Sequence, residues 1–537
     1  MLRRLAPALD RGRTRLTRLR ALPTRLRTLP TRLRSAEGPL VPDGRLAWTL
    51  GLLLAGLLPA VPLVHLYAAR RGELTDPGFV LASAAVAAAA LIVAAALIAR
   101  HRSHNPLRVG AGVGVVGLLF FASNLLSDDL AIRIAFFTVA APFAARGAAA
   151  VLHRREPAVV AIAACLVYVG VATIGQLGSP TSSQSSDAAP VVAANTSAKP
   201  PNVYYFVLGA HAREDVAQRL DPADDPSGFD RALRSLGFAI DPIATANYLQ
   251  DDQSVASTLE QRLIIQERSA PETVSADLND TLRGENQTVD WFRAQRYRYV
   301  QTSLPQLPGG SCDRDRADGC LALFDALDAV LNLTPLGPVL GGSEPSSTAQ
   351  FTPNDVVDAL VEDDVIDDDR PTFVMAHIVS PHPPYIRDAD CASIGAVGSL
   401  GEGWAERHKR YYMAQLRCAR TQLRRAMRRL VALDPTAIIV LQSDTGPAFD
   451  LAFGAPADRL TEQMVRTRYG AFRAWRLPPR CRTTDERASS LVNTFAVVQA
   501  CIAGKPPQMV NAQAFVNWFD STRVERLPSG IAYPSSR

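Results

Sequence analysis

Apolar and polar positions divide the chain into two unlike halves. Between residues 47 and 176, nearly continuous apolar stretches alternate with short polar segments. Each stretch approaches the roughly 20 residues that a helix needs to cross the hydrocarbon core of a bilayer. The pattern therefore predicts a domain of five transmembrane helices, at 47–69, 78–99, 109–127, 130–152 and 158–176.

Beyond residue 200 the pattern changes to short apolar runs separated by longer periodic stretches. Continuous apolar runs at 202–208, 373–379 and 437–442 predict strands that are covered on both faces. Stretches with an apolar residue at every third or fourth position, at 213–237, 353–364 and 404–430, predict helices. This alternation predicts an α/β domain with a largely parallel sheet over 201–537.

Charge gives these two halves an orientation. Residues 1–200 carry 22 basic and 9 acidic side chains, whereas 201–537 carry 35 basic and 43 acidic ones. An Arg-rich arm, 1–46, precedes the first span. The loops at 100–108 and 154–155 are basic, whereas those at 70–76 and 128–129 contain acidic residues. The positive-inside rule then predicts a bacterial-type inner (plasma) membrane protein with a cytoplasmic N-terminus and an extracytoplasmic C-terminal domain. The arm is too long, and its apolar span too complete, for a cleavable signal peptide.

The rest of the composition predicts a linker, an oxidising compartment for the C-terminal domain and the class of partner. Residues 177–200 are rich in Ser, Pro and Ala and predict a flexible linker. Because the basic charge belongs to the membrane half, we expect the lipid bilayer as a partner and no nucleic acid. Six cysteines lie in the exported domain, where disulfides are expected. Fifteen pairings are open, and nearest-neighbour pairing is preferred: Cys312–Cys320, Cys391–Cys418 and Cys481–Cys501.

Candidate chemistry gathers in four segments that the pattern places at strand ends, where α/β sheets bind ligands. They are 208–213, 246–257, 377–385 and 442–447. Together with Pro201-Asn202-Val203-Tyr204-Tyr205, Ser-Pro-His-Pro-Pro-Tyr at 380–385, Gln-Ser-Asp at 442–444 and residues 468–478, these segments resemble a known family. It is that of the membrane-anchored sulfatase-like proteins of the alkaline phosphatase superfamily, whose relatives include lipoteichoic acid synthases and other phosphoglycerol transferases. The resemblance covers roughly 200–500.

The resemblance implies a divalent cation held by an acid after the first strand, a Thr or Ser nucleophile and an Asp-His pair. Such a metal lowers the pKa of the hydroxyl and neutralises charge on the transferred group. At the corresponding positions this chain has Gly209, Asp251 and Thr445, and only Asp444 is kept. His382 and Arg213 also match and are expected to bind substrate.

Three interpretations of this site stay open. Asp251 and Asp444, helped by His382 or His211 and with Asp252 as a spare, form a rebuilt site for Mn²⁺ or Mg²⁺ and remain catalytic. Alternatively, no cofactor binds, Asp251 is a loop carboxylate and His382 is structural. In the third case the alignment is shifted, and Asp252 or Ser254 takes the place of Asp251.

We therefore expect a cell-envelope pseudoenzyme, a catalytically impaired relative of phosphoglycerol transferases. It would act in glycopolymer or lipid biogenesis by binding an envelope glycopolymer, a phospholipid or a partner protein. The alternatives are an active phosphoester transferase or phosphodiesterase, and a purely structural assembly factor. Sulfate ester hydrolysis is disfavoured, because the chain has no Cys or Ser in a C/S-x-P-x-R motif.

Overall fold

The structure is a computed structural model of the chain. It describes residues 44–70, 77–102, 104–123, 130–152, 154–177, 200–302, 312, 316–321, 323, 326–335, 350–398, 402–449, 451–481, 483, 485–518 and 521–528. Nearly all of the predicted arm and linker lies outside the described residues. The chain divides into two compact units. The first comprises Met1–Val61, Ala87–Leu119 and Thr138–Tyr168, and the second comprises Pro62–Val86, Phe120–Phe137 and Val169–Arg537.

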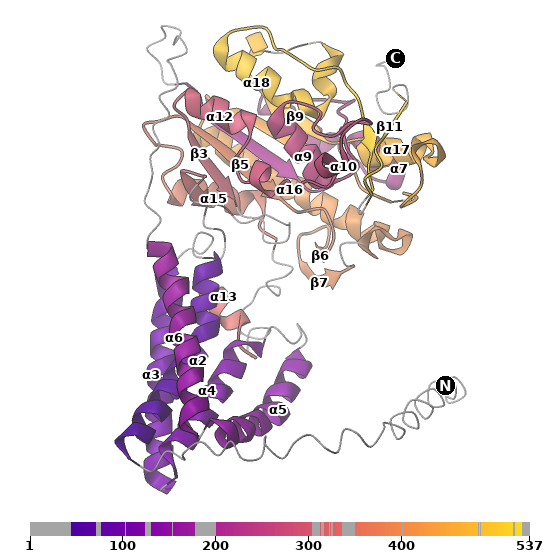
Figure 1. Cartoon of the computed structure of the whole chain (residues 1–537). Helices are drawn as coiled ribbons and strands as arrows, with labels where there is room; N and C mark the ends of the chain where they lie inside the picture. Colours follow the sequence, from indigo (N-terminus) through magenta and orange to yellow (C-terminus); the bar gives the residue numbers. More distant parts are fainter. Residues whose placement is uncertain are drawn as a thin grey trace, which may run out of the picture. The chain divides into compact units, whose positions relative to one another are not determined.

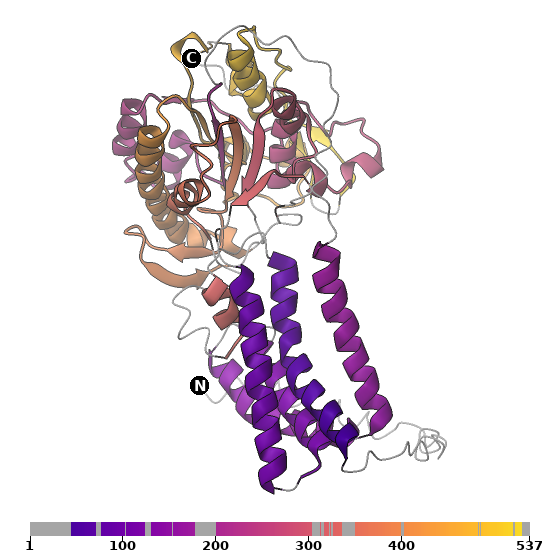
Figure 2. The same ribbon diagram turned by 90° about the vertical axis from the view of Figure 1, so that its left-hand side faces the viewer.

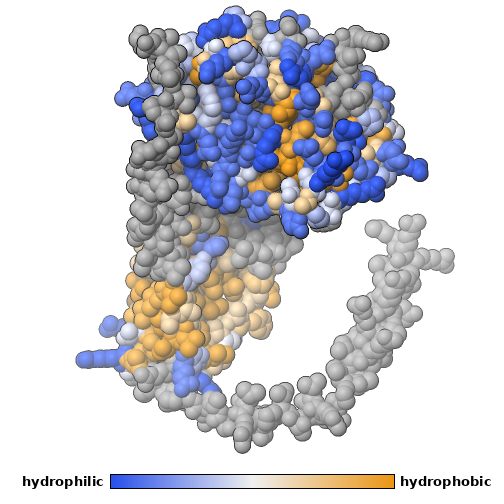
Figure 3. Space-filling model, turned by 45° about the horizontal axis from the view of Figure 1, so that its top comes forward, coloured by the Kyte–Doolittle hydropathy of each residue, from blue (hydrophilic) through white to orange (hydrophobic). Residues whose placement is uncertain are grey.

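Five helices occupy the positions of the five predicted spans. They are α2 (Arg45–Arg70), α3 (Pro77–Arg102), α4 (Pro106–Phe121), α5 (Leu130–Val151) and α6 (Arg155–Leu177). By length and composition, two stretches in the described residues are able to cross a membrane, Arg45–Ala68 and Gly78–His101. The apolar stretches of the other three helices are shorter. Figure 3 shows the visible surface of the helices as mostly apolar and that of the α/β domain as mostly hydrophilic.

A seven-stranded sheet forms the centre of the second unit (Figure 1). The strand order is β2 (Ala239–Ile240), β9 (Arg473–Arg476), β8 (Ile438–Ser443), β1 (Val203–Leu208), β5 (Thr372–Ile378), β3 (Arg298–Thr302) and β4 (Gly319–Leu321). The five strands from β8 to β4 run parallel, and β9 and β2 are antiparallel to their neighbours. The prediction of an α/β domain with a largely parallel sheet is confirmed.

The three predicted central strands β1, β5 and β8 are buried along their whole length, as their continuous apolar runs require. One face of the sheet packs against α8 (Ser227–Ser235), α15 (Pro353–Glu362) and α16 (Lys409–Leu433). The other face packs against α9 (Asp251–Glu260), α12 (Gln287–Ala294) and α18 (Thr494–Ala503). Figure 2, in which α16 is the long orange-brown helix, shows helices on both sides of the strands.

Smaller elements complete the domain. The short helices are α7 (Glu214–Leu220), α10 (Pro271–Val274), α11 (Asn279–Leu282), α13 (Ala326–Asn332) and α17 (Glu462–Tyr469). Two small antiparallel pairs are formed by β6 (Tyr385–Arg387) with β7 (Ser393–Val397), and by β10 (Phe515–Val516) with β11 (Glu525–Arg526). The three disulfides join Cys312 to Cys320, Cys391 to Cys418 and Cys481 to Cys501, so the nearest-neighbour pairing is confirmed.

Two helix predictions need correction. The stretch 213–237 is not one helix but two, α7 and α8, because Pro222 and Pro226 lie between them and proline does not continue a helix. The helix expected at 404–430 begins later, at Lys409, after two short 3₁₀ turns at Glu402–Trp404 and Glu406–His408. The helix expected at 353–364 is α15.

Candidate functional site

The carboxyl ends of three central strands meet at one edge of the sheet. Strand β1 lies between β5 and β8, and its Leu208 is in register with Ile378 and Ser443. The segments that follow these strands therefore lie next to one another. Three of the four candidate segments are strand ends, as predicted. The fourth is not, since Asp251 is the first residue of helix α9, and Thr245 and Tyr248 just before it make isolated strand bridges.

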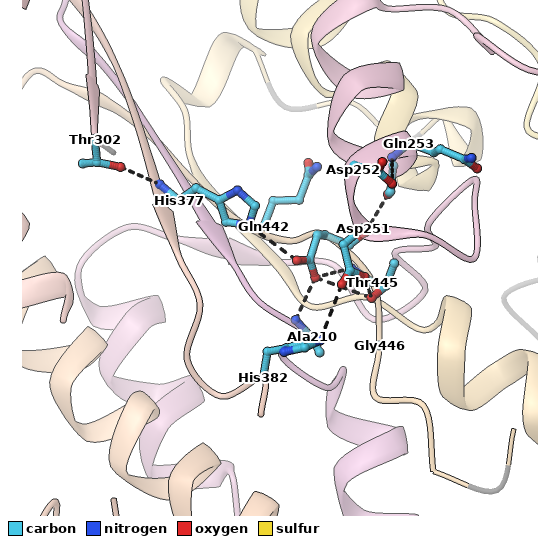
Figure 4. Close-up of polar contacts among 12 residues, drawn as sticks. Ala210, Asp251, Asp252, Gln253, Thr302, His377, His382, Gln442, Thr445 and Gly446 are labelled. Carbon is cyan, nitrogen blue, oxygen red and sulfur yellow. Dashed lines mark hydrogen bonds and ion pairs between the residues drawn. The ribbon is translucent and has the colours of Figure 1, made fainter. Parts of the chain in front are cut away.

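Asp444, which directly follows β8, is held mainly by backbone groups. Its Oδ1 accepts hydrogen bonds from the backbone N–H groups of Ala210, at 2.7 Å, and of Thr445, at 2.6 Å. Its Oδ2 lies 3.5 Å from Nε2 of His377, which stands on β5. The carboxylate is buried, so these donors replace the water that it loses. Asp444 therefore ties the ends of β1, β5 and β8 together. Figure 4 labels its partners Ala210, His377 and Thr445.

Asp251 lies in the first turn of α9, where the helix dipole favours a negative charge. Its Oδ1 accepts hydrogen bonds from Oγ1 of Thr445, at 2.8 Å, and from Nη2 of Arg468, at 2.7 Å. Its Oδ2 lies 3.7 Å from Nε2 of His382. Burial alone would raise the pKa of the Asp251 carboxyl, but Arg468, His382 and the Thr445 hydroxyl together lower this pKa below its usual range. Asp251 is therefore an ionised carboxylate near neutral pH.

Arg468 was not assigned a role by the sequence, although it opens one of the segments that carry the family resemblance. It lies near the end of α17, three residues after the fully buried Val465 and so on the same helix face. Its guanidinium is itself buried and reaches both α9 and the segment after β8. That helical spacing was the signal available in the sequence.

His382 enters the site from the segment after β5. Its Nδ1 lies 2.8 Å from the carbonyl oxygen of Pro383, and its ring contacts Trp404 edge to face. A neutral imidazole that donates from Nδ1 presents Nε2 as an acceptor, whereas a protonated one donates toward Asp251. The side chain is 15% exposed and that of Asp251 is 20% exposed, so these two groups are the more accessible part of the site.

Gly209, which the family resemblance aligns with the first-strand acid, lies where the fold leaves no room for a side chain. A Cβ atom built on Gly209 would lie 2.1 Å from the carbonyl oxygen of Val379 and 3.1 Å from Cβ of His382. The backbone also closes over this residue, because the N–H of His382 donates to the carbonyl of Gly209 at 3.0 Å. The position is therefore sealed by the segment after β5.

Two other predicted residues are engaged elsewhere. Arg213 forms a bidentate ion pair with Asp215, with the shortest N–O distance 2.6 Å, and donates to the carbonyl of Ala244 at 2.8 Å. His211 is buried against the rings of Phe229 and Phe472. In the described part of the chain, neither forms a hydrogen bond or ion pair with Asp251 or Asp444.

The two residues offered as alternatives to Asp251 have local roles. Burial raises the pKa of Asp252, and the charge of Asp251 raises it further. Its Oδ1 accepts from the backbone N–H of Gln253. The hydroxyl of Ser254 donates to the carbonyl of Asp444 at 2.5 Å, which joins α9 to the end of β8. Ser254 is buried, so its hydroxyl serves this contact.

The carboxylate oxygens of this site do not fit the divalent cation that the family resemblance implies. Oδ1 of Asp444 is occupied by two backbone N–H groups, and Oδ1 of Asp251 by a hydroxyl and a guanidinium. At position 209 the Val379 carbonyl takes the space that a carboxylate ligand would need. Within the described ranges, no group of three or more His, Cys, Asp or Glu side chains has the arrangement of a metal site.

No protein-family model matches the chain, and no curated protein matches it. Several solved structures are similar to it. The periplasmic domain of EptC from Escherichia coli is 12% identical, over 62% of this chain and 95% of that one, with a TM-score of 0.41. The integral membrane protein lipooligosaccharide phosphoethanolamine transferase A from Neisseria meningitidis is 11% identical, over 84% and 95%, with a TM-score of 0.38. An alkaline phosphatase superfamily protein from Vibrio parahaemolyticus is 12% identical, over 60% and 74%, with a TM-score of 0.38.

Proposed function

We propose that this protein is a membrane-anchored pseudoenzyme of the bacterial cell envelope. Its exported sulfatase-like domain keeps the architecture of a phosphoester-processing enzyme without the metal chemistry. Five membrane helices, a cytoplasmic N-terminus and an extracytoplasmic C-terminal domain complete the proposal. In support of lipid contact, large apolar side chains such as Val86, Phe143 and Val160 are 69%, 68% and 67% exposed on α3, α5 and α6.

The observation that carries this proposal is the state of the positions where the family holds its metal. Gly209 has no side-chain ligand atom and no space for one, and the carboxylate of Asp251 is paired with Arg468. A carboxylate paired in this way is a weaker metal ligand, since Arg468 and Thr445 occupy its Oδ1 and the guanidinium already balances its charge. Such a domain is suited to binding an envelope glycopolymer, a phospholipid or a partner protein in glycopolymer or lipid biogenesis.

A second candidate is an active phosphoester transferase or phosphodiesterase. It is favoured by the convergence of Asp251 and His382, which come from different segments, lie 3.7 Å apart and are both partly exposed. An ionised carboxylate beside an imidazole is a pair that general acid–base chemistry uses. In this case substrate would approach these two side chains.

One experiment separates the candidates. The full chain is purified in detergent, its Mn, Mg, Ca and Zn content is measured, and hydrolysis of bis(p-nitrophenyl) phosphate is assayed with each ion added. The pseudoenzyme proposal expects no stoichiometric metal and no hydrolysis above that of the Asp251→Asn, His382→Gln double variant. Stoichiometric metal that is lost in Asp444→Ala, or hydrolysis that this double variant abolishes, would overturn it in favour of the enzyme.

A further inference from the structure

Arg468 uses all three nitrogens of its guanidinium inside the protein. Nε and Nη2 donate to the carbonyl oxygen of Leu249, at 2.9 and 2.7 Å. Nη1 donates to the carbonyl oxygen of Gly446 at 2.7 Å, and Nη2 also reaches Asp251. The guanidinium therefore joins three segments: the residue before the α9 N-cap, the first turn of α9 and the segment after β8.

The oxygen atoms around this guanidinium would suit a cation of another kind. Two backbone carbonyls and the carboxylate of Asp251 surround the positive charge. The hydroxyl of Thr445 donates a hydrogen bond to the same Oδ1 of Asp251 that Arg468 contacts. Carbonyl and carboxylate oxygens are the ligands that hard metal ions take in proteins. Here the planar guanidinium of an arginine donates hydrogen bonds to all of these oxygens. A lysine ammonium group would match their positions less completely.

We propose that Arg468 is the built-in cation of this site. Its guanidinium holds the N-terminus of α9 against the end of β8, in place of the metal ion that the resembled family uses to join these segments. The comparison with a metal rests on the proposed function. The coupling of Arg468 to Asp251 does not, because it follows from the contacts of these two side chains alone.

The first test is a double-variant cycle on the full chain in detergent, followed by thermal unfolding. Arg468→Ala leaves Asp251 partly buried without a counter-charge, and we expect the melting temperature to fall by about 5–10 °C. Asp251→Asn introduced into this background is expected to recover part of the loss, although Asp251→Asn alone lowers the melting temperature. The control is Arg466→Ala on the same helix. Its ion-pair partner Glu462 is exposed, so we expect this substitution to change the melting temperature little.

The second test is chemical rescue of Arg468→Ala. Ethylguanidinium at millimolar concentration is expected to raise the melting temperature of this variant more than ethylammonium does, and to leave the wild type unchanged. If Arg468 acted only by donating hydrogen bonds to the two carbonyls, the loss in melting temperature of Arg468→Ala would not depend on the residue at position 251. Additive effects of the two substitutions, or equal responses to both ligands, would therefore overturn the proposal.

A variant that fails to fold does not end the experiment. Arg468→Lys keeps the charge and loses the fork, so it is expected to unfold between the wild type and Arg468→Ala. A lysine variant no better than Arg468→Met would also overturn the assignment. Metal found in the wild-type protein would refute the proposed function, whereas the cycle tests the arginine separately.

Discussion

The segments after β1 and after β8 lie side by side at the same edge of the sheet, yet they differ in what they offer to a ligand. After β8, Asp444 keeps a carboxylate and fixes it with backbone donors from both segments. After β1, Gly209 offers no side chain, and the backbone around Val379 fills the space beside it. The difference indicates that the fold itself uses the carboxylate of Asp444, whereas backbone atoms fill the space beside Gly209.

The closed segment gives the largest expected effect. In Gly209→Asp the new Cβ would lie 2.1 Å from the carbonyl oxygen of Val379, which is a backbone atom. Overpacking of a core costs about 1–3 kcal/mol, and a clash with backbone exceeds the upper end of that range. We expect the full-length variant to lose most of its folded population, measured by thermal unfolding and by yield in detergent.

Gly228→Asp is the matched control, because a Cβ at Gly228 meets nothing within 4 Å. A Gly209→Asp protein as stable as this control would show that the segment after β5 yields easily. The first-strand ligand position would then be open, and the contrast between the two strand ends would disappear.

The second prediction concerns the carboxylate after β8. Asp444→Ala leaves the buried N–H groups of Ala210 and Thr445 without their acceptor, and an unsatisfied buried group costs about 1–3 kcal/mol. We expect a loss of about 2–4 kcal/mol in the free energy of unfolding. Asp458→Ala, at an exposed carboxylate, is the control and should change stability little. Equal losses in the two variants would mean that Asp444 does not hold the strand ends together.

The central strands were predictable because strands covered on both faces are mostly apolar, and 203–208, 373–376 and 437–441 are continuous apolar runs. The break between α7 and α8 could also have been predicted, since two prolines lie there. The apolar spacing nevertheless led to the prediction of one helix. Disulfide pairing followed from proximity along the chain. For the strands and the helix break, the deciding information lies within a few residues of the element itself, and the paired cysteines are 8, 27 and 20 residues apart.

The state of the site was not predictable in this way. The motifs located Asp251, His382 and Asp444 at one edge of the sheet, where the structure brings them together. They did not indicate that Arg468, 217 residues after Asp251, supplies the counter-charge. Nor did they indicate that Gly209 is enclosed by the Val379 carbonyl. Both depend on distances between segments that are far apart in the sequence, and no local pattern records such distances.

The smallest of the three effects belongs again to the segment after β1, and it depends on pH. Burial, together with the nearby Arg420 charge, lowers the pKa of His211 to about 3. The described contacts leave its Nε2 without a hydrogen-bond partner. Because the unfolded chain binds the proton near the ordinary pKa of about 6.5, the unfolded state gains stability as pH falls below that value. The folded protein should therefore lose stability progressively between about pH 6.5 and 3.

His211→Phe removes this proton from both states and fits among the aromatic rings of Phe229 and Phe472. Near pH 7.5, where the imidazole is neutral in both states, the two proteins differ only in packing, which provides the internal control. At pH 5 the wild type should have lost about 2 kcal/mol more than the variant, since each pH unit below the unfolded pKa contributes about 1.4 kcal/mol. Thermal unfolding at both pH values measures this difference. Curves that stay parallel would mean that His211 is protonated in the fold, and that the segment after β1 is open to water after all.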